Sequence, residues 1–218
     1  MRERLGTLGG MEGHDLRLET DRLIVRRYEE HDVPDILAYS QHEPSDEHRR
    51  RNIDWELNEE SIREWWAPMT SMRPEEAIHW LSLVIELRAG GRVIGNTGFN
   101  AKRIGDTFQG QTGWIIGAPY EGHGYVTEAA TALLDHLFDD IGFHRVYAMT
   151  SPDNRRSWRV MERLGMRREA HFVRNCYHNS GWADEYVYAI LADEWAARRS
   201  WHAAPGIADN PSPGTRSE

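Results

Sequence analysis

Residues 117–130 read GAPYEGHGYVTEAA, and this stretch decides the fold. It follows a strand-like apolar run at 114–116 (WII) and leads directly into a periodic helix. Gly122 and Gly124 lack a Cβ, so the turn that contains them can point its backbone N–H groups outward. The first amides of a helix add partial positive charge. A strand, a glycine turn and a helix start in this order favour phosphate binding, with a plain structural turn as the alternative.

Periodicity elsewhere predicts the elements around this turn. After the turn, apolar residues recur at intervals of three and four, which is typical of an amphipathic helix. Helices are predicted at residues 126–141, 59–66 and 74–80, after the N-cap Asp32, and from the N-cap Asp153 or Asn154 to Leu164. Strands are predicted at residues 16–28, 80–87, 92–100, 107–116, 144–150, 167–177 and 182–191. This order indicates a mixed α/β sheet with helices packed on it.

The composition is that of a folded protein that does not bind nucleic acid. The 218 residues carry a net charge of −9, which opposes binding by neutralisation of nucleic-acid phosphates. The same charge suits a cationic partner or ordinary solubility. We expect a cytoplasmic protein with no membrane partner, because no apolar run has the length of a membrane helix and the N-terminus lacks a signal-peptide core. The single cysteine, Cys176, excludes an internal disulfide and a cysteine-rich metal site, and no metal is expected.

Both ends of the chain are predicted to be disordered. Residues 1–13 combine glycines with few large apolar groups, and Met11 is an alternative start to Met1. Residues 203–218 (AAPGIADNPSPGTRSE) are rich in Pro, Gly and Ser. One folded domain is therefore expected over residues 14–202, without internal repeats or an interdomain linker.

Several further motifs follow in a fixed order along this body. They are LETDRL at 18–23, VIG at 93–95, GW at 113–114, PYEGHGY at 119–125, TEA at 127–129, NRRS at 154–157, ERLGM at 162–166, GWAD at 181–184 and LADEW at 191–195. In this ordered set the sequence resembles the GCN5-related N-acetyltransferase (GNAT) superfamily, and within it the RimJ/RimL-like branch, over about residues 16–196. The resemblance implies the GNAT acyl-CoA N-acyltransferase fold: a central, mostly antiparallel sheet with one parallel, splayed strand pair, flanked by helices.

The resemblance also implies acetyl-CoA as the cofactor. Its pantetheine arm is expected along Ile115 and Ile116, its pyrophosphate on the backbone of the glycine turn, and further contacts at the start of the next helix. The cofactor-binding residues so implied are Ile115, Ile116, Glu121, Gly122, His123, Gly124, Tyr125, Val126, Asn154 and Ser157. Pro119 departs from the general family pattern, which has Gln or Arg there, but proline is common in the RimJ/RimL-like branch. His123 stands where lysine or glutamine is common, and a cradle built from backbone tolerates that change.

Direct transfer of an acetyl group to a primary amine needs a neutral amine, a stabilised oxyanion and a proton for the leaving thiolate. Many relatives supply that proton from a tyrosine, where this chain has Met161, which cannot donate. The resemblance points instead to Ser157 as the catalytic acid, with a capping or cofactor-binding role as the alternative. The base is unassigned. Gln111 replaces a glutamate found in some relatives, Glu128 suits a helix-dipole acid, and Asp184 either reaches the acceptor or pairs with an arginine.

The segment before the first hairpin is where this fold sets acceptor specificity. Its acidic and aromatic residues are Asp46, Glu47, Asp54, Trp55, Glu56, Glu59, Glu60, Glu64, Trp65 and Trp66. They suit a cationic amine, or form a solvated helix pair. The resemblance favours a protein N-terminal amine as acceptor. The alternatives are a small cationic amine, such as an aminoglycoside-type antibiotic or a polyamine, and an idle acetyl-CoA-binding module. As for the oligomeric state, the resemblance makes a homodimer possible, since dimers are common among similar proteins.

Overall fold

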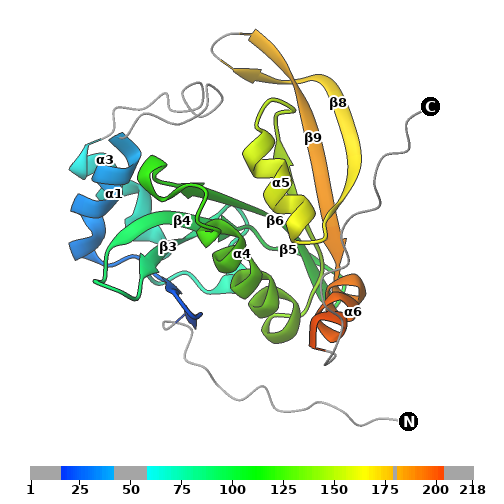
Figure 1. Ribbon diagram of the computed structural model, residues 1–218, viewed down its shortest axis with the longest axis horizontal. Helices are drawn as coiled ribbons and strands as arrows, with labels where there is room; N and C mark the ends of the chain where they lie inside the picture. Colours follow the sequence, from blue (N-terminus) through cyan, green and yellow to red (C-terminus); the bar gives the residue numbers. More distant parts are fainter. Residues whose placement is uncertain (1–15, 42–57, 179–180, 204–218) are drawn as a thin grey trace.

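The strands of the computed structural model form one sheet in the order β1-β2-β3-β4-β6-β7-β9-β8, with β5 paired to β6 (Figure 1). The structure describes residues 16–41, 58–178 and 181–203. The strands are β1 (Arg17–Glu19), β2 (Leu23–Arg26), β3 (Leu81–Leu87), β4 (Val93–Phe99), β5 (Lys102–Ile104), β6 (Thr107–Ile116), β7 (Phe143–Thr150), β8 (Arg167–His178) and β9 (Gly181–Leu191). Every pairing is antiparallel except that of β6 with β7.

Helices cover both faces of this sheet. They are α1 (Val33–Gln41), α3 (Glu59–Trp66), α4 (Tyr125–Asp135), α5 (Arg155–Arg163) and α6 (Ala192–Ala203). Short turns of helix are η1 (Glu30–Asp32), η2 (Ala67–Met69), η3 (Pro74–Glu76) and η4 (Ala118–Tyr120), and α4 continues into the π-helical turn η5 (His136–Asp140). In the described part of the chain, no helix combines the length and apolar character needed to cross a membrane.

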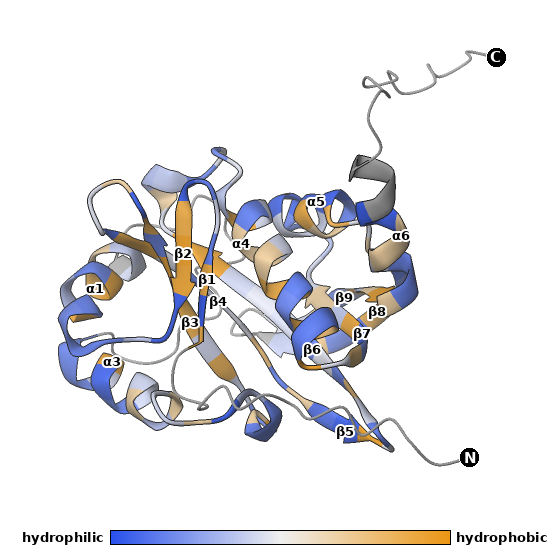
Figure 2. Cartoon of the chain, turned by 90° about the horizontal axis from the view of Figure 1, so that it is seen from below, coloured by the Kyte–Doolittle hydropathy of each residue, from blue (hydrophilic) through white to orange (hydrophobic). Residues whose placement is uncertain are grey.

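The alternation of side chains along β3 assigns these helices to their faces. Val84 packs in a cluster with residues of α1 and α3, whereas Leu83 and Ile85 belong to the larger core that contains the buried residues of α4. Successive residues of a strand point to opposite faces, so α1 and α3 lie on one face and α4 on the other. β2 is buried along its whole length, and Figure 2 shows it as a hydrophobic strand between these layers.

The parallel pair β6–β7 opens at one end. Their pairing runs from Phe108↔Phe143 to Gln111↔Tyr147. Beyond that point β6 continues to Ile116, paired with β4, and β7 continues to Thr150, paired with β9. The two strands therefore diverge where α4 leaves β6, and the predicted splayed pair is confirmed. A parallel pair needs a crossover connection, which α4 supplies.

Most predicted elements are confirmed, including the β3–β4 hairpin, α3 and the long β8–β9 hairpin. The single strand predicted at 16–28 is wrong, because the chain turns back after Glu19 and β1 pairs antiparallel with β2. The helix predicted at 74–80 is limited to the single turn η3. Helix α6 was not predicted. The disorder expected at 1–13 and 203–218 concerns residues outside the described ones, apart from Ala203 at the end of α6.

Asp32 precedes α1, as expected, but its carboxylate serves other groups. It accepts hydrogen bonds from Arg26 Nη1 and Nη2, each at 2.8 Å, and from the Glu29 amide at 2.8 Å. Arg26 also donates to Glu86 on β3 at 2.6 Å. The predicted N-cap therefore anchors β2 to the start of α1, with both charges buried and paired.

Gly110 on β6 has no room for a side chain. A Cβ there would lie 1.8 Å from the Asn100 carbonyl oxygen and 2.9 Å from the Phe143 ring. We expect Gly110→Ala to lower the free energy of unfolding by about 1–3 kcal/mol, as overpacking does. Gly113→Ala is the matched control, because its Cβ would meet the Trp80 ring at 3.3 Å. Urea unfolding of both variants is the measurement, and equal midpoints would contradict the prediction.

Candidate active site

A cavity of about 540 Å³ lies between the diverging ends of β6 and β7. Its walls come from β6, the glycine turn, the start of α4, the end of β7, one side of α5, and Tyr39 and Ser40 of α1. Ile115 pairs with Asn96, whose side chain donates to the Tyr39 hydroxyl at 2.8 Å, so Ile115 faces the α1 layer. Trp114 and Ile116 face the α4 layer. The cavity therefore has walls on both faces of the sheet.

The glycine turn has the backbone that the sequence predicts. Gly122 has a φ of 78° and Gly124 a φ of 80°, a region that residues with a Cβ rarely adopt. Gly124 is the N-cap of α4, and its carbonyl accepts the first helical bond from the Glu128 amide at 3.1 Å. The amides ahead of Glu128 precede this first bond and have no helical partner. A turn of this kind at a helix N-terminus is suited to an anion.

Glu128 fastens this turn to the β1–β2 connection. Its carboxylate accepts bonds from Thr20 Oγ1 at 2.5 Å, the Arg22 amide at 3.0 Å and Arg22 Nε at 2.7 Å. The Arg22 guanidinium also donates to the His123 carbonyl at 3.0 Å and lies 4.6 Å over the Tyr125 ring. Glu128 is thus engaged in holding the turn and is not among the residues lining the cavity. These bonds between Glu128 and the β1–β2 connection, which we call the Glu128 clamp, were not predicted from the sequence. The DRL and TEA motifs, which contain Arg22 and Glu128, were the signal that could have indicated them.

Helix α5 presents a row of arginines to the cavity. Arg156, Arg159 and Arg163 line it, and their spacing of three and four places them on one side of the helix. Arg156 forms an ion pair with Glu121, which ties α5 to the glycine turn. These arginines were also missed, although their spacing is visible in the sequence and would have indicated a cationic helix face.

The start of α5 brings Asn154 and Ser157 to the same cavity. Asn154 is the N-cap, and its Oδ1 accepts the Ser157 amide at 3.0 Å. The cap thus uses the backbone of Ser157 and not its hydroxyl. Met161, one turn further on, is buried and lines the cavity with an apolar side chain. The Ser157 hydroxyl is therefore not used by the cap, and Ser157 lines the cavity.

The structure brings together all the predicted cofactor-binding residues except one. The residues that line the cavity are Ile115, Ile116, Glu121, Gly122, Gly124, Tyr125, Val126, Asn154 and Ser157. His123 is absent from the lining, because its ring stacks on Tyr125 with centroids 5.6 Å apart and its Nδ1 lies 2.8 Å from the Glu121 carbonyl oxygen. The imidazole therefore lies exposed beside the turn and does not line the cavity.

The predicted base and acceptor residues are only partly brought to the cavity. Gln111 lines it, whereas Asp184 accepts bonds from His171 Nε2 at 2.7 Å and the Arg174 amide at 2.9 Å within the β8–β9 hairpin. These bonds, the Arg174 amide first, lower the pKa of Asp184. In the acidic segment, Asp46, Glu47, Asp54, Trp55 and Glu56 lie outside the described residues, and Glu59, Glu60 and Glu64 are exposed on α3.

Comparison with known proteins identifies relatives over most of the chain. A family model described as an acetyltransferase (GNAT) domain matches residues 22–167. The uncharacterized N-acetyltransferase YnaD of Bacillus subtilis is 42% identical over 85 residues, which cover 39% of this chain and 50% of YnaD. The ribosomal protein uS5-alanine N-acetyltransferase of Escherichia coli is 25% identical over 198 residues, which cover 84% of this chain and 95% of that enzyme. The match thus spans about half of the first relative and nearly all of the second.

Solved structures share the fold. A GNAT-family acetyltransferase from Bacillus anthracis has a TM-score of 0.70 at 28% identity, covering 82% of this chain and 100% of that one. Mycobacterium smegmatis RimJ, solved in complex with CoA-disulfide, has a TM-score of 0.69 at 24% identity, covering 87% of this chain and 93% of its own. At 24% identity, the similarity to Mycobacterium smegmatis RimJ establishes a shared fold only.

The Glu128 clamp predicts a pH-dependent contribution to stability. Burial alone would raise the pKa of Glu128, but the bonds from Thr20 and Arg22 outweigh it and the net pKa is lowered from 4.5. A lowered carboxyl pKa stabilises the fold above the unfolded value and loses that effect as the pH falls. Glu128→Gln should therefore cost about 1 kcal/mol at pH 7, a modest value because Arg22 is half exposed, and progressively less below about pH 4.5.

Thermal unfolding from pH 7 to pH 3 measures this difference between wild type and variant. Glu60→Gln is the matched control, because Glu60 is exposed on α3. A gap between wild type and Glu128→Gln that stays constant over this pH range would refute an ionic role for the carboxylate.

Proposed function

The chain belongs to the GNAT family of acetyltransferases, and from this membership we propose that it is an acetyl-CoA-dependent N-acetyltransferase acting on a primary amine. The observation that carries the proposal is the cavity between β6 and β7, which is lined by the glycine turn at the start of α4 and by the arginine row of α5. Acetyl-CoA has the matching form: a phosphorylated nucleotide at one end, a chain of amides in the middle and a thioester at the other end.

The lining residues fit this cofactor by their chemistry. The backbone amides of the turn at 122–126 would hold the pyrophosphate, and the guanidinium groups of α5 would neutralise phosphate charge. Ile115 and Ile116 lie on the part of β6 that no longer pairs with β7, so their backbone would pair with the amides of the pantetheine arm. The complex of Mycobacterium smegmatis RimJ with CoA-disulfide, a neighbour in fold, supports this assignment.

Bound acetyl-CoA would supply the activated acetyl group, and this chain would supply position and protons. We infer that, as the C–N bond forms and the C–S bond breaks, the Ser157 hydroxyl gives its proton to the departing thiolate and regains one from the attacking nitrogen through solvent, since Met161 cannot donate. Among the described residues that line the cavity, the one carboxylate is Glu121, and it is paired with Arg156. Among the described residues, an amine entering from the α1 side therefore meets no unpaired carboxylate, and we propose that it gives up its proton to solvent before attack.

A protein N-terminal amine is the acceptor that these walls favour. On the α1 side the described lining consists of Tyr39, Ser40, Gln111 and the exposed side of Ile115, which are neutral or apolar. A small polycation would need carboxylates there to balance its remaining charges, whereas one α-amine on an uncharged peptide end would not. The relative that acetylates the alanine of ribosomal protein uS5 supports the same choice.

An acceptor panel tests this function. CoA release would be measured with peptides that bear free N-terminal Ala or Ser, with the same peptides N-acetylated, and with an aminoglycoside and a polyamine. Turnover confined to free peptide N-termini is expected. Faster turnover of the aminoglycoside or polyamine would reject the peptide acceptor, and acetyl-CoA binding without any turnover would reject the enzymatic function.

Ser157→Ala tests the catalytic acid. Because the Asn154 cap binds the amide of Ser157, the variant should keep α5 intact. We expect kcat to fall roughly 10²-fold, the usual contribution of general acid catalysis, with little change in the KM for acetyl-CoA. Ser40→Ala, which alters another hydroxyl of the lining, is the control. Unchanged turnover in Ser157→Ala would remove Ser157 from the mechanism.

A further inference from the structure

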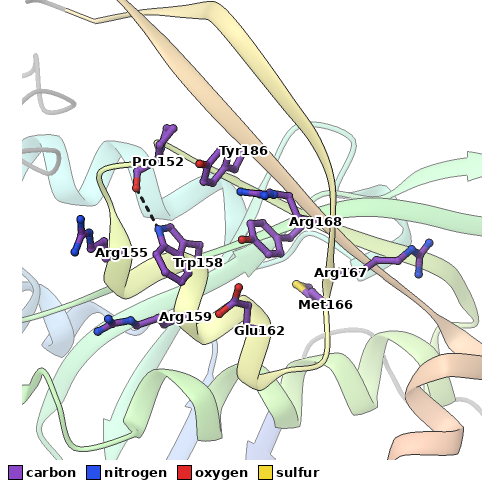
Figure 3. A pocket seen from close by; sticks show the side chains of 10 residues that line it. Pro152, Arg155, Trp158, Arg159, Glu162, Met166, Arg167, Arg168 and Tyr186 are labelled. Carbon is purple, nitrogen blue, oxygen red and sulfur yellow. Dashed lines mark hydrogen bonds between the residues drawn. The ribbon is translucent and has the colours of Figure 1, made fainter. Parts of the chain in front are cut away.

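A second cavity, of about 560 Å³, lies on the other side of α5, between that helix and the β8–β9 hairpin (Figure 3). It is close in volume to the first cavity. Its lining residues are Pro152, Arg155, Trp158, Arg159, Glu162, Met166, Arg167, Arg168, Tyr186 and Tyr188. Arg159 lines both cavities, so the two are separated by the thickness of one helix. Apart from Arg159, no residue that lines the second cavity has a role in the proposed acetyl transfer.

The second cavity carries an excess of positive charge. Arg167 is neutralised by Glu194 and Glu169. Within the described ranges, Arg155, Arg159 and Arg168 have no carboxylate within 4.0 Å. Such a cluster in a chain of net charge −9 attracts an anion locally against the overall charge.

The acidic residue of the cavity does not cancel this charge. Glu162 is the one carboxylate among the described lining residues, and burial together with its charge raises the pKa of Tyr188. One carboxylate against three arginines without an ion-pair partner leaves the lining with a net positive charge. The groups that would bind an anion there are the guanidinium groups of α5 and β8.

Flat aromatic surfaces accompany these cations. The Trp158 indole is held in place by its Nε1, which donates to the Pro152 carbonyl at 3.1 Å (Figure 3). The Arg168 guanidinium lies 4.6 Å over the Tyr186 ring, and the His171 ring meets Tyr186 edge-on with centroids 4.9 Å apart. Fixed aromatic faces beside unpaired guanidinium groups recognise a planar ring that bears an anionic group.

We propose that the second cavity binds an aromatic phosphate monoester of about mononucleotide size. Its phosphate is bound by Arg155 of α5 and Arg168 of β8, which line this cavity and not the first, and its ring packs against Trp158 and Tyr186. The volume falls within the usual range for small-molecule sites, roughly 300–1,000 Å³. The ligand thus bridges α5 and the β8–β9 hairpin.

Calorimetric titration of the CoA-saturated protein tests this site, because CoA would block binding of the probe in the first cavity. The probe is GMP, with guanosine and inorganic phosphate as its two halves. We expect GMP to bind once per chain, and each half to bind at least about 10-fold more weakly, since it forgoes either the charged contacts or the stacking. Binding that CoA abolishes, or inorganic phosphate that binds as tightly as GMP, would overturn the proposal.

Variants assign the binding to these residues. Arg168→Gln should weaken GMP binding about 10-fold, the cost of one charge-assisted contact. Arg103→Gln is the matched control, because Arg103 also lies over an aromatic ring, Phe108, but on β5. Trp158→Phe should bind GMP while losing the fluorescence change that GMP causes. Equal affinities in Arg168→Gln and Arg103→Gln, or an unchanged fluorescence response in Trp158→Phe, would place any GMP elsewhere and overturn the proposal.

Discussion

The end of pairing between β6 and β7 at Gln111↔Tyr147 is the constraint on which the rest of the molecule depends. Each strand stays in the sheet through its other neighbour, so the sheet remains continuous while a cavity opens inside it. The crossover to the parallel strand starts at the end of β6, and after η4 and the glycine turn it continues as helix α4. The amides at the N-terminus of α4 therefore lie at the opening between the two strands. Helix α5, which follows β7 in the chain, forms another wall of the cavity.

Long-range bonds hold these pieces around the opening. Glu128 joins α4 to the β1–β2 connection, Glu121 joins the glycine turn to α5, and Asn154 caps α5. Two carboxylates near the glycine turn are thus committed to arginine partners, and the turn amides and the remaining arginines of α5 set the local charge. An acidic chain can in this way present a positive cavity to phosphate groups.

The parts of this arrangement that depend on neighbouring residues could be predicted from the sequence. The parts that depend on contacts between distant residues could not. The Gly122 and Gly124 turn and the Asn154 cap depend on neighbouring residues, and the structure has both. The partners of Glu128 lie more than a hundred positions away in the sequence, so its structural role was one of two open interpretations. His123 was predicted to contact the cofactor because the resemblance includes it in the glycine turn, whereas the stacking of its ring on Tyr125 was not predicted. The strand predicted at 16–28 failed because the Thr20 hydroxyl, which accepts the Leu23 amide, supports a turn there.

The exposed side of Ile115 has a consequence for selectivity. The part of β6 beyond Gln111 is an edge strand enclosed within a sheet, so neighbouring molecules cannot add a strand to it as they can at an outer edge. Any extended chain with amides at peptide-like spacing can pair with such an edge, because backbone hydrogen bonds do not distinguish side chains. Discrimination among ligands must then come from the two ends of the cavity. The strand edge in the middle adds to the affinity for any such ligand but does not distinguish one from another.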